Sequence, residues 1–156
     1  MLFNTACSVK KTINTNYSKN SIEKRVINSG DRYTAWDDFT VLDKKTGLLW
    51  EVKSTTASQN KLYWFNAENH CDSLIHANRN NWHLPTIEEL KTLLSIQKSL
   101  NNGYINPEYF PLNIPFSYWS STEGYGHSGW YVDFDAGGDS AYDDSEKKYA
   151  RCVHVD

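Results

Sequence analysis

The stretch Trp82-His83-Leu84-Pro85-Thr86-Ile87-Glu88-Glu89-Leu90 contains the start of a helix. Thr86-Ile87-Glu88-Glu89 has the S/T-x-x-E form of a capping box, in which the threonine oxygen accepts one free backbone amide and Glu89 accepts another. Pro85 keeps an upstream helix from running into this cap. The spacing predicts a helix that begins after Thr86, with a buried stripe at Ile87, Leu90, Leu93 and Leu94.

The sequence before this helix predicts a hairpin and then another helix. The β-rich runs 39–43 and 48–52 flank Lys44-Lys45-Thr46-Gly47, where Gly47 can adopt a positive φ, so they predict two antiparallel strands. Residues 60–77 contain no Gly or Pro. Their apolar positions recur at the spacing of one helical face, which predicts a helix buried through Trp64, Ala67, Cys71, Leu74 and Ile75.

After about Leu100 the pattern changes to short strands and loops. The runs 118–121, 130–134 and 149–153 are β-type, and Gly137-Gly138 predicts a turn. In the second run, Trp130, Val132 and Phe134 fall on one face by the period of two. The order of a hairpin, two helices and several strands predicts an α+β fold.

The length of 156 residues fits one ordinary domain. Residues 1–30 are rich in Asn, Lys, Ser and Thr without a sustained period, so we expect a flexible basic tail or linker before a domain at 31–156. Aromatic residues make up 14% of the chain, which suits a compact core with much loop. No stretch approaches about 18 consecutive apolar residues, which excludes a transmembrane helix by sequence.

The charges are distributed unevenly along the chain. Residues 1–32 hold six basic and two acidic side chains, whereas residues 99–146 contain no Lys or Arg and eight acidic residues. Such a stretch repels phosphate, so we expect no nucleic-acid partner. The HExxH metalloprotease motif and the G-x-S-x-G nucleophile elbow are both absent from the sequence, which argues against an enzyme.

The three cysteines, Cys7, Cys71 and Cys152, lack the close spacing of a zinc site. The residues alone are compatible with two arrangements. Either all three cysteines are buried free thiols, or Cys71 and Cys152 form a disulfide and Cys7 stays unpaired. Thr5-Ala6-Cys7 places a small residue before a cysteine, as at a bacterial lipoprotein cleavage site, although Asn4 stands where an aliphatic residue is usual.

The acidic run near the C-terminus is a candidate metal site. Hard cations such as Ca²⁺ need several carboxylate or carbonyl oxygens, but the spacing here is not that of an EF-hand, and a solvated acidic face is the plainer interpretation. The speculative calcium ligands are Asp133, Asp135, Asp139 and Asp143.

Aromatic and polar residues in the same region suit a sugar. Ring faces can cover the apolar side of a pyranose while carboxylates bind its hydroxyls. Trp50, Trp82, Trp119 and Trp130 are instead expected in the core. The candidate ligand-binding residues are Tyr125, His127, Tyr131, Asp133, Asp135, Asp139, Tyr142, Asp143 and Asp144.

Six ordered motifs carry a resemblance to a known family. They are 41–50 (VLDKKTGLLW), 82–90 (WHLPTIEEL), 110–111 (FP), 118–122 (YWSST), 130–134 (WYVDF) and 151–153 (RCV). Over about residues 31–155 the chain resembles the bacterial Lcl C-terminal domain family, named after a collagen-like adhesin. The resemblance implies a C-type-lectin-like fold, with two helices packed on small antiparallel sheets and long C-terminal loops.

The resemblance also implies export and a disulfide. Family members are typically exported or surface-attached and carry cysteines matching Cys71 and Cys152, so the pair is a credible bond worth about 4 kcal/mol in the chain-entropy model. The naming adhesin binds sulfated glycosaminoglycans. Here, however, His83 stands where the family usually has Arg, and His154 where a further Arg is common, so this specificity is not carried over.

The function implied is a non-catalytic extracellular or cell-surface module, expected to bind glycans and act in adhesion. A protein–protein interaction module of a surface or secretion system is the alternative, with a host or cell-surface protein as partner, and oligomers are compatible with either. A third possibility is an oxidase like the formylglycine-generating enzyme, which shares the lectin-like fold but needs a reactive cysteine pair. Fold alone does not decide among them.

Overall fold

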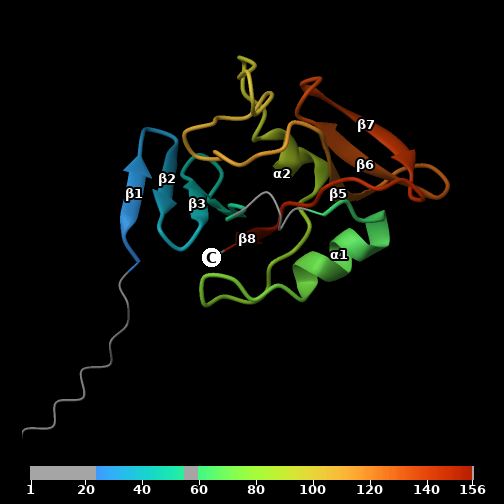
Figure 1. Ribbon diagram of the computed structural model, residues 1–156. Coiled ribbons are helices and arrows are strands. Elements are labelled where there is room, and N and C mark those ends of the chain that lie inside the picture. Colours follow the sequence, from blue (N-terminus) through green and yellow to red (C-terminus); the bar gives the residue numbers. More distant parts are fainter. Residues whose placement is uncertain (1–23, 55–59, 156) are drawn as a thin grey trace, which may run out of the picture.

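The computed structural model describes residues 24–54 and 60–155, and has two helices and two antiparallel sheets in this part of the chain (Figure 1). The α+β class predicted from the sequence is therefore confirmed. The elements are β1 (Val26–Ser29), β2 (Tyr33–Trp36), β3 (Thr40–Asp43), β4 (Leu48–Glu51), α1 (Trp64–Asp72), α2 (Ile87–Lys91), β5 (Ser117–Glu123), β6 (Ser128–Asp133), β7 (Gly138–Asp143) and β8 (Val153–Val155).

The strands form one larger and one smaller sheet. The larger has the order β1-β2-β3-β4-β8, so the last strand of the chain pairs with β4 from the N-terminal half. The smaller is the meander β5-β6-β7. Figure 1 shows α1 beside the smaller sheet and α2 between the two sheets. None of the helices in the described residues is long and apolar enough to cross a membrane.

The hairpin predicted at 39–52 is confirmed as β3–β4. Leu42 pairs with Leu49 and Asp43 with Leu48. Gly47 has φ of 77°, and its backbone N–H donates to the carbonyl of Asp43 at 2.8 Å. Glycine adopts this left-handed conformation without a Cβ clash, which explains the turn residue.

The predicted capping box is also present at the start of α2. The Thr86 Oγ1 accepts from the Glu89 backbone N–H at 3.3 Å, and the Glu89 carboxylate accepts from the Thr86 N–H at 2.8 Å. Ile87, Leu90 and Leu93 are buried as expected, and Leu94 is partly buried.

The first helix is shorter than predicted. Ala67 and Cys71 are fully buried on its inner face, but α1 ends at Asp72 and Ile75 is 81% exposed. The backbone of Ala77 and Asn78 is left-handed, which is incompatible with helix at that end of the predicted segment. Apolar spacing alone therefore extended the helix by too many residues.

The strand predictions need correction in several places, beginning with β2, which was not predicted at all. β1 lies inside the segment 1–30 expected to be a tail, so ordered structure begins earlier than predicted; residues 1–23, including Cys7, lie outside the described residues. β7 was missed because its sequence, GDSAYD, consists mostly of small and polar residues. An edge strand tolerates such residues because many of its positions are exposed. In the run predicted at 149–153, only Val153 belongs to a strand, β8.

The core contains three of the four tryptophans expected there. Trp50, Trp82 and Trp119 are at most 1% exposed, whereas Trp130 is partly buried against the same core as Val132 and Phe134. One group of buried side chains joins β2–β4 to α2 and the second sheet, and another surrounds Cys71 and Cys152. The large rings supply buried area where helices and strands are short.

Cys71 of α1 and Cys152 are joined by a disulfide, with the two Cα atoms 5.4 Å apart. Beside it, the buried Arg151 donates to the carbonyl of Glu51 at 2.7 Å and to the amide oxygen of Asn113 at 3.0 Å. Glu51 forms a buried ion pair with Lys53 at 2.7 Å. Burial alone would raise the pKa of Glu51, but the charge of Lys53 holds it below its ordinary value.

Candidate functional site

The predicted acidic residues lie at different places on the hairpin formed by β6 and β7. Asp133 ends β6, and its carboxylate accepts from Ser117 Oγ at 3.0 Å and from the backbone N–H groups of Asp135 and Ala136. Asp135 forms an ion pair with Lys98 at 2.7 Å. At this end of the hairpin the carboxylates close a turn and pair with a lysine.

The opposite end of the hairpin holds four other predicted residues. Tyr125 and His127 are exposed in the connection between β5 and β6, and the Asp144 N–H donates to the carbonyl of His127 at 3.0 Å. Asp143 lies opposite Ser128 in the ladder, and its carboxylate accepts from the Ser145 N–H at 2.8 Å. Bonds to Ser145 lower the pKa of the Asp143 carboxyl.

The four speculative calcium ligands do not converge. Asp133 and Asp143 lie at opposite ends of the ladder between β6 and β7, roughly 17 Å apart at the usual rise per strand residue. Asp139 faces α2 and forms an ion pair with Lys91 at 3.7 Å. Within the described residues, no group of three or more His, Cys, Asp or Glu could hold a metal ion. Calcium binding by the domain stays a prediction.

Tyr131 and Tyr142 do share a face, and a lysine lies between their rings. Tyr131 pairs with Trp119, and Tyr142 pairs with Gly129, so all these side chains project on one side of the small sheet. The Lys148 Nζ is 4.3 Å from the ring centre of Tyr131, 4.7 Å from that of Trp119 and 5.0 Å from that of Tyr142. A cation over three rings is held by the negative ring faces.

Two further lysines flank Lys148. Leu62 and Lys148 exchange two backbone hydrogen bonds, of 2.7 and 3.0 Å, which brings Lys61 close to the segment that contains Lys147 and Lys148. Lys61 Nζ lies 4.9 Å from the ring centre of Phe116, and Lys147 Nζ lies 4.6 Å from that of Tyr63. We call the set Lys61, Lys147, Lys148, Tyr63, Phe116 and Tyr142 the lysine face.

Four members of the lysine face, its three lysines and Phe116, line a small open cavity of about 160 Å³ together with Ser117 and Glu146. Tyr63, Phe116 and Tyr142 are each about half exposed. Burial lowers the pKa of Lys148, and Lys61 lowers it further against the opposing effects of Glu146 and Asp133. The arrangement presents positive charge beside apolar rings, which suits an anion attached to an apolar or sugar surface.

Tyr131 and Tyr142 were predicted from the sequence, but the three lysines were not. The region reads as acidic in the sequence, although the Lys-Lys pair at 147–148 directly ends the stretch without basic residues. That pair was the available signal. Lys61 is 86 positions before Lys147, so only the bridge between Leu62 and Lys148 brings it to the site.

The family assignment agrees with the resemblance carried by the motifs. Residues 39–154 match the Lcl C-terminal domain, and because this match spans most of the sequence, the chain belongs to that family. A comparison with curated proteins finds no match to the chain. The match includes the disulfide, the small sheet and all three lysines of the lysine face.

Proposed function

We propose that this chain is a non-catalytic binding module that acts outside the cell or on its surface and recognises glycans carrying carboxylate or sulfate groups. The observation that carries the proposal is the lysine face, where three lysines and the half-exposed Phe116 line one cavity. The half-exposed rings of Tyr63 and Tyr142 lie beside Lys147 and Lys148. Membership of the Lcl C-terminal domain family supports a surface-associated role.

The chemistry of this face favours an acidic glycan over a neutral one. Lys61, Lys147 and Lys148 offset the single carboxylate of Glu146 around the cavity, so the local charge is positive although the chain carries −3 overall. The rings of Phe116 and Tyr142 can cover the apolar face of a sugar while the lysines bind its acidic groups. Contacts with exposed lysines depend strongly on salt.

Two other features support an extracellular binding module. The Cys71–Cys152 disulfide fits an oxidising compartment. Two helices with two antiparallel sheets fit the C-type-lectin-like fold that we propose for this family member. In such a domain the loops at one end of a sheet are free to bind while the core keeps its packing.

The test is a glycan array that includes neutral, carboxylated and sulfated glycans, probed with the oxidised protein in calcium and again in EDTA. We expect acidic glycans to bind under both conditions, and the Lys61→Ala/Lys147→Ala variant to lose at least tenfold in affinity. The control is Lys44→Ala/Lys45→Ala, which removes two exposed charges from the β3–β4 turn.

Equal losses in the two double variants would assign the effect to overall charge rather than to the lysine face. Binding that appears only in calcium would move the site to the hairpin carboxylates, with Asp133→Ala/Asp135→Ala as the variant to examine. A blank array under both conditions would overturn the glycan proposal and favour the protein-interaction alternative, in which free saccharide does not compete.

A further inference from the structure

A larger cavity, of about 630 Å³, shares no lining residue with the lysine face. It opens between the β1–β2 turn, the segment that follows α2 and the segment 106–109. We call it the Arg32 cleft. Its lining residues include Asp31, Arg32, Leu93, Ile96, Glu108 and Tyr109. Its volume is within the range of ligand pockets in proteins.

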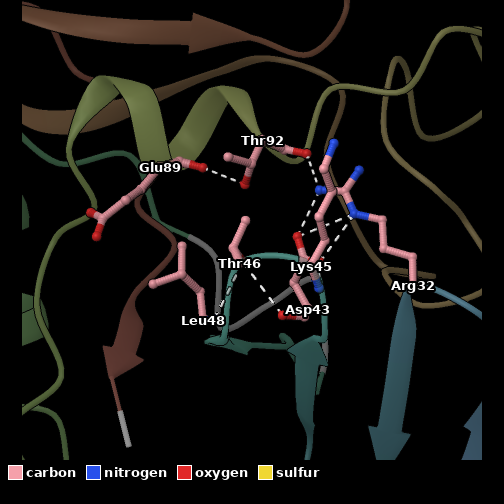
Figure 2. Close-up of polar contacts among 7 residues, drawn as sticks. All are labelled: Arg32, Asp43, Lys45, Thr46, Leu48, Glu89 and Thr92. Atoms are coloured by element: carbon pink, nitrogen blue, oxygen red, sulfur yellow. Dashed lines mark hydrogen bonds and ion pairs between the residues drawn. The ribbon is translucent and has the colours of Figure 1, made fainter.

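Arg32 lines this cleft, and its hydrogen bonds hold it in one position. Figure 2 shows its guanidinium between Asp43 of β3 and the carbonyl of Thr92 at the end of α2. The Nη2 group donates to Asp43 Oδ2 at 2.6 Å and to Thr92 O at 2.5 Å, and Nε donates to both Asp43 oxygens at 3.2 Å. Asp43 is fully buried, whereas the Arg32 side chain is 34% exposed.

One nitrogen of the Arg32 guanidinium takes no part in these bonds. No described residue accepts a hydrogen bond from the Arg32 Nη1 group. The carboxylate of Asp43 raises the pKa of Arg32, so the guanidinium stays protonated. A fixed donor whose charge is already balanced by Asp43 suits an uncharged acceptor such as a peptide carbonyl.

The rim of the cleft carries negative charge. Asp31 and Glu108 are both exposed at the cavity, while the positive charge of Arg32 is balanced by Asp43. A sulfated or carboxylated ligand would therefore be repelled here, and a lysine or arginine side chain would be attracted. The charge preference is opposite to that of the lysine face.

The walls of the cleft favour an apolar side chain over a sugar. Ile96 is completely exposed beside the buried Leu93. The rings of Tyr33 and Tyr109 pack against each other with centres 5.1 Å apart, and they are only 5% and 7% exposed. Their faces are thus unavailable for stacking on a pyranose, but the exposed aliphatic surface can contact an apolar side chain.

We propose that the Arg32 cleft binds a short segment of a partner protein in which an apolar side chain is followed by Lys or Arg. The apolar side chain packs on the exposed Ile96 and on the partly exposed Leu94, which also lines the cleft. The basic side chain lies between Asp31 and Glu108, and a backbone carbonyl of the segment accepts from Arg32 Nη1. In this kind of recognition, a small apolar contact contributes affinity and complementary charges contribute specificity.

The experiment is an array of immobilised hexapeptides probed with the oxidised full-length chain at low salt. The probes are Gly-Ser-Leu-Lys-Ser-Gly and its Phe-Lys counterpart, with Leu-Glu and Ser-Lys versions as matched peptide controls. We expect binding to the Leu-Lys and Phe-Lys peptides only. The strongest peptide is then titrated in solution, by fluorescence, against each protein variant.

The variant Ile96→Ser/Glu108→Gln changes two exposed residues of the cleft, and we expect it to lose at least tenfold in peptide affinity. The control Leu100→Ser/Glu88→Gln replaces a similarly exposed pair outside the cavity and should stay within twofold of the parent. Unchanged melting temperatures would show that both variants are folded.

Three results would overturn the proposal. They are equal binding to the Leu-Glu peptide, the same loss in the cleft variant and in its control, and a blank peptide array. Because the lysine face contributes no residue to this cleft, failure here leaves the glycan proposal intact, and failure on the glycan array leaves this proposal intact.

Discussion

The lysine face and the Arg32 cleft use arginine and lysine in opposite ways. In the lysine face, Lys61 and Lys147 are exposed beside half-exposed rings, so their positive charge is available to a ligand. In the Arg32 cleft the guanidinium is bonded to a fully buried Asp43, and the charges left at the rim are those of Asp31 and Glu108. The difference shows that pairing and burial, rather than residue type, set the local charge of a surface.

Each region also depends on a different tertiary connection. Lys61 and Lys148 lie just before the two elements that the disulfide joins, α1 and the Arg151-Cys152-Val153 segment. Arg32 instead depends on Asp43 at the end of β3 and on Thr92 after α2. Substitutions in one connection are therefore expected to affect one region more than the other.

The largest effect is expected from removing the disulfide. Cys71→Ser/Cys152→Ser removes a link across 81 positions, which should lower the free energy of unfolding by about 4 kcal/mol, because the unfolded chain is then less restricted. Urea unfolding measures this loss. As the urea concentration rises, the glycan affinity of the lysine face should fall at a lower concentration than the peptide affinity of the Arg32 cleft. The control is the parent protein after reduction, which should lose the same amount. Three free thiols in the oxidised parent would contradict the prediction.

A smaller effect is expected from Asp43→Asn. The buried carboxylate accepts from Arg32 and from the Lys45 N–H, so its neutral replacement leaves the guanidinium without its counter-charge and should cost about 2 kcal/mol of stability. Peptide affinity at the Arg32 cleft should fall, whereas glycan affinity at the lysine face should not.

The matched control for that variant is Asp37→Asn, because the Arg25–Asp37 pair is long, at 3.8 Å, and exposed. Its unfolding free energy should change by less than about 0.5 kcal/mol. Equal losses for Asp43→Asn and Asp37→Asn would show that the Arg32–Asp43 pair does not hold the cleft.

The smallest effect is a pH dependence of the lysine face. Because burial lowers the pKa of Lys148 below its ordinary value of 10.5, raising the pH removes the proton from Lys148 before it leaves an ordinary lysine. As the pH is raised, affinity for an acidic glycan should therefore begin to decrease already at a pH below 10.5. The decrease should be about threefold, because one charge contact is lost.

Titration of the parent and of Lys148→Met at several pH values checks this. The methionine fills the space among the rings without a charge, so the difference in affinity between the two proteins should shrink as the pH rises. Binding of the Leu-Arg counterpart of the peptide at the Arg32 cleft serves as the internal reference, because Arg32 and the peptide arginine both keep their protons over this range. A constant difference in affinity would indicate that Lys148 contributes packing only.

Local signals predicted much of the fold. The capping box at Thr86 and the Gly47 turn are each formed by residues within four positions of one another, so the sequence shows them directly. β1 and β7 were missed because edge strands need hydrogen bonds on only one side and tolerate polar residues. The end of α1 was misplaced because apolar spacing continues to Ile75 after the backbone has left the helix.

The candidate site was less predictable than the fold. Of the candidate ligand residues, Tyr142 belongs to the lysine face and Tyr131 lies beside its Lys148. The carboxylates grouped with them in sequence are instead separated between the two ends and the opposite face of the hairpin. A strand places neighbouring side chains on alternate faces and moves about 3.3 Å per residue, so closeness in sequence does not bring carboxylates together in space.

The sequence by itself determined the α+β class, the family, the hairpin, the cap of α2 and the aromatic core, because these depend on local spacing and hydrophobicity. Only the tertiary structure decided which charges are available. The bridge between Leu62 and Lys148 brings the distant Lys61 to the neighbouring pair Lys147 and Lys148, and the buried Asp43 balances the charge of Arg32. Electrostatic interactions act through space and are weakened by solvent, so their outcome depends on distance and burial that the order of residues does not contain.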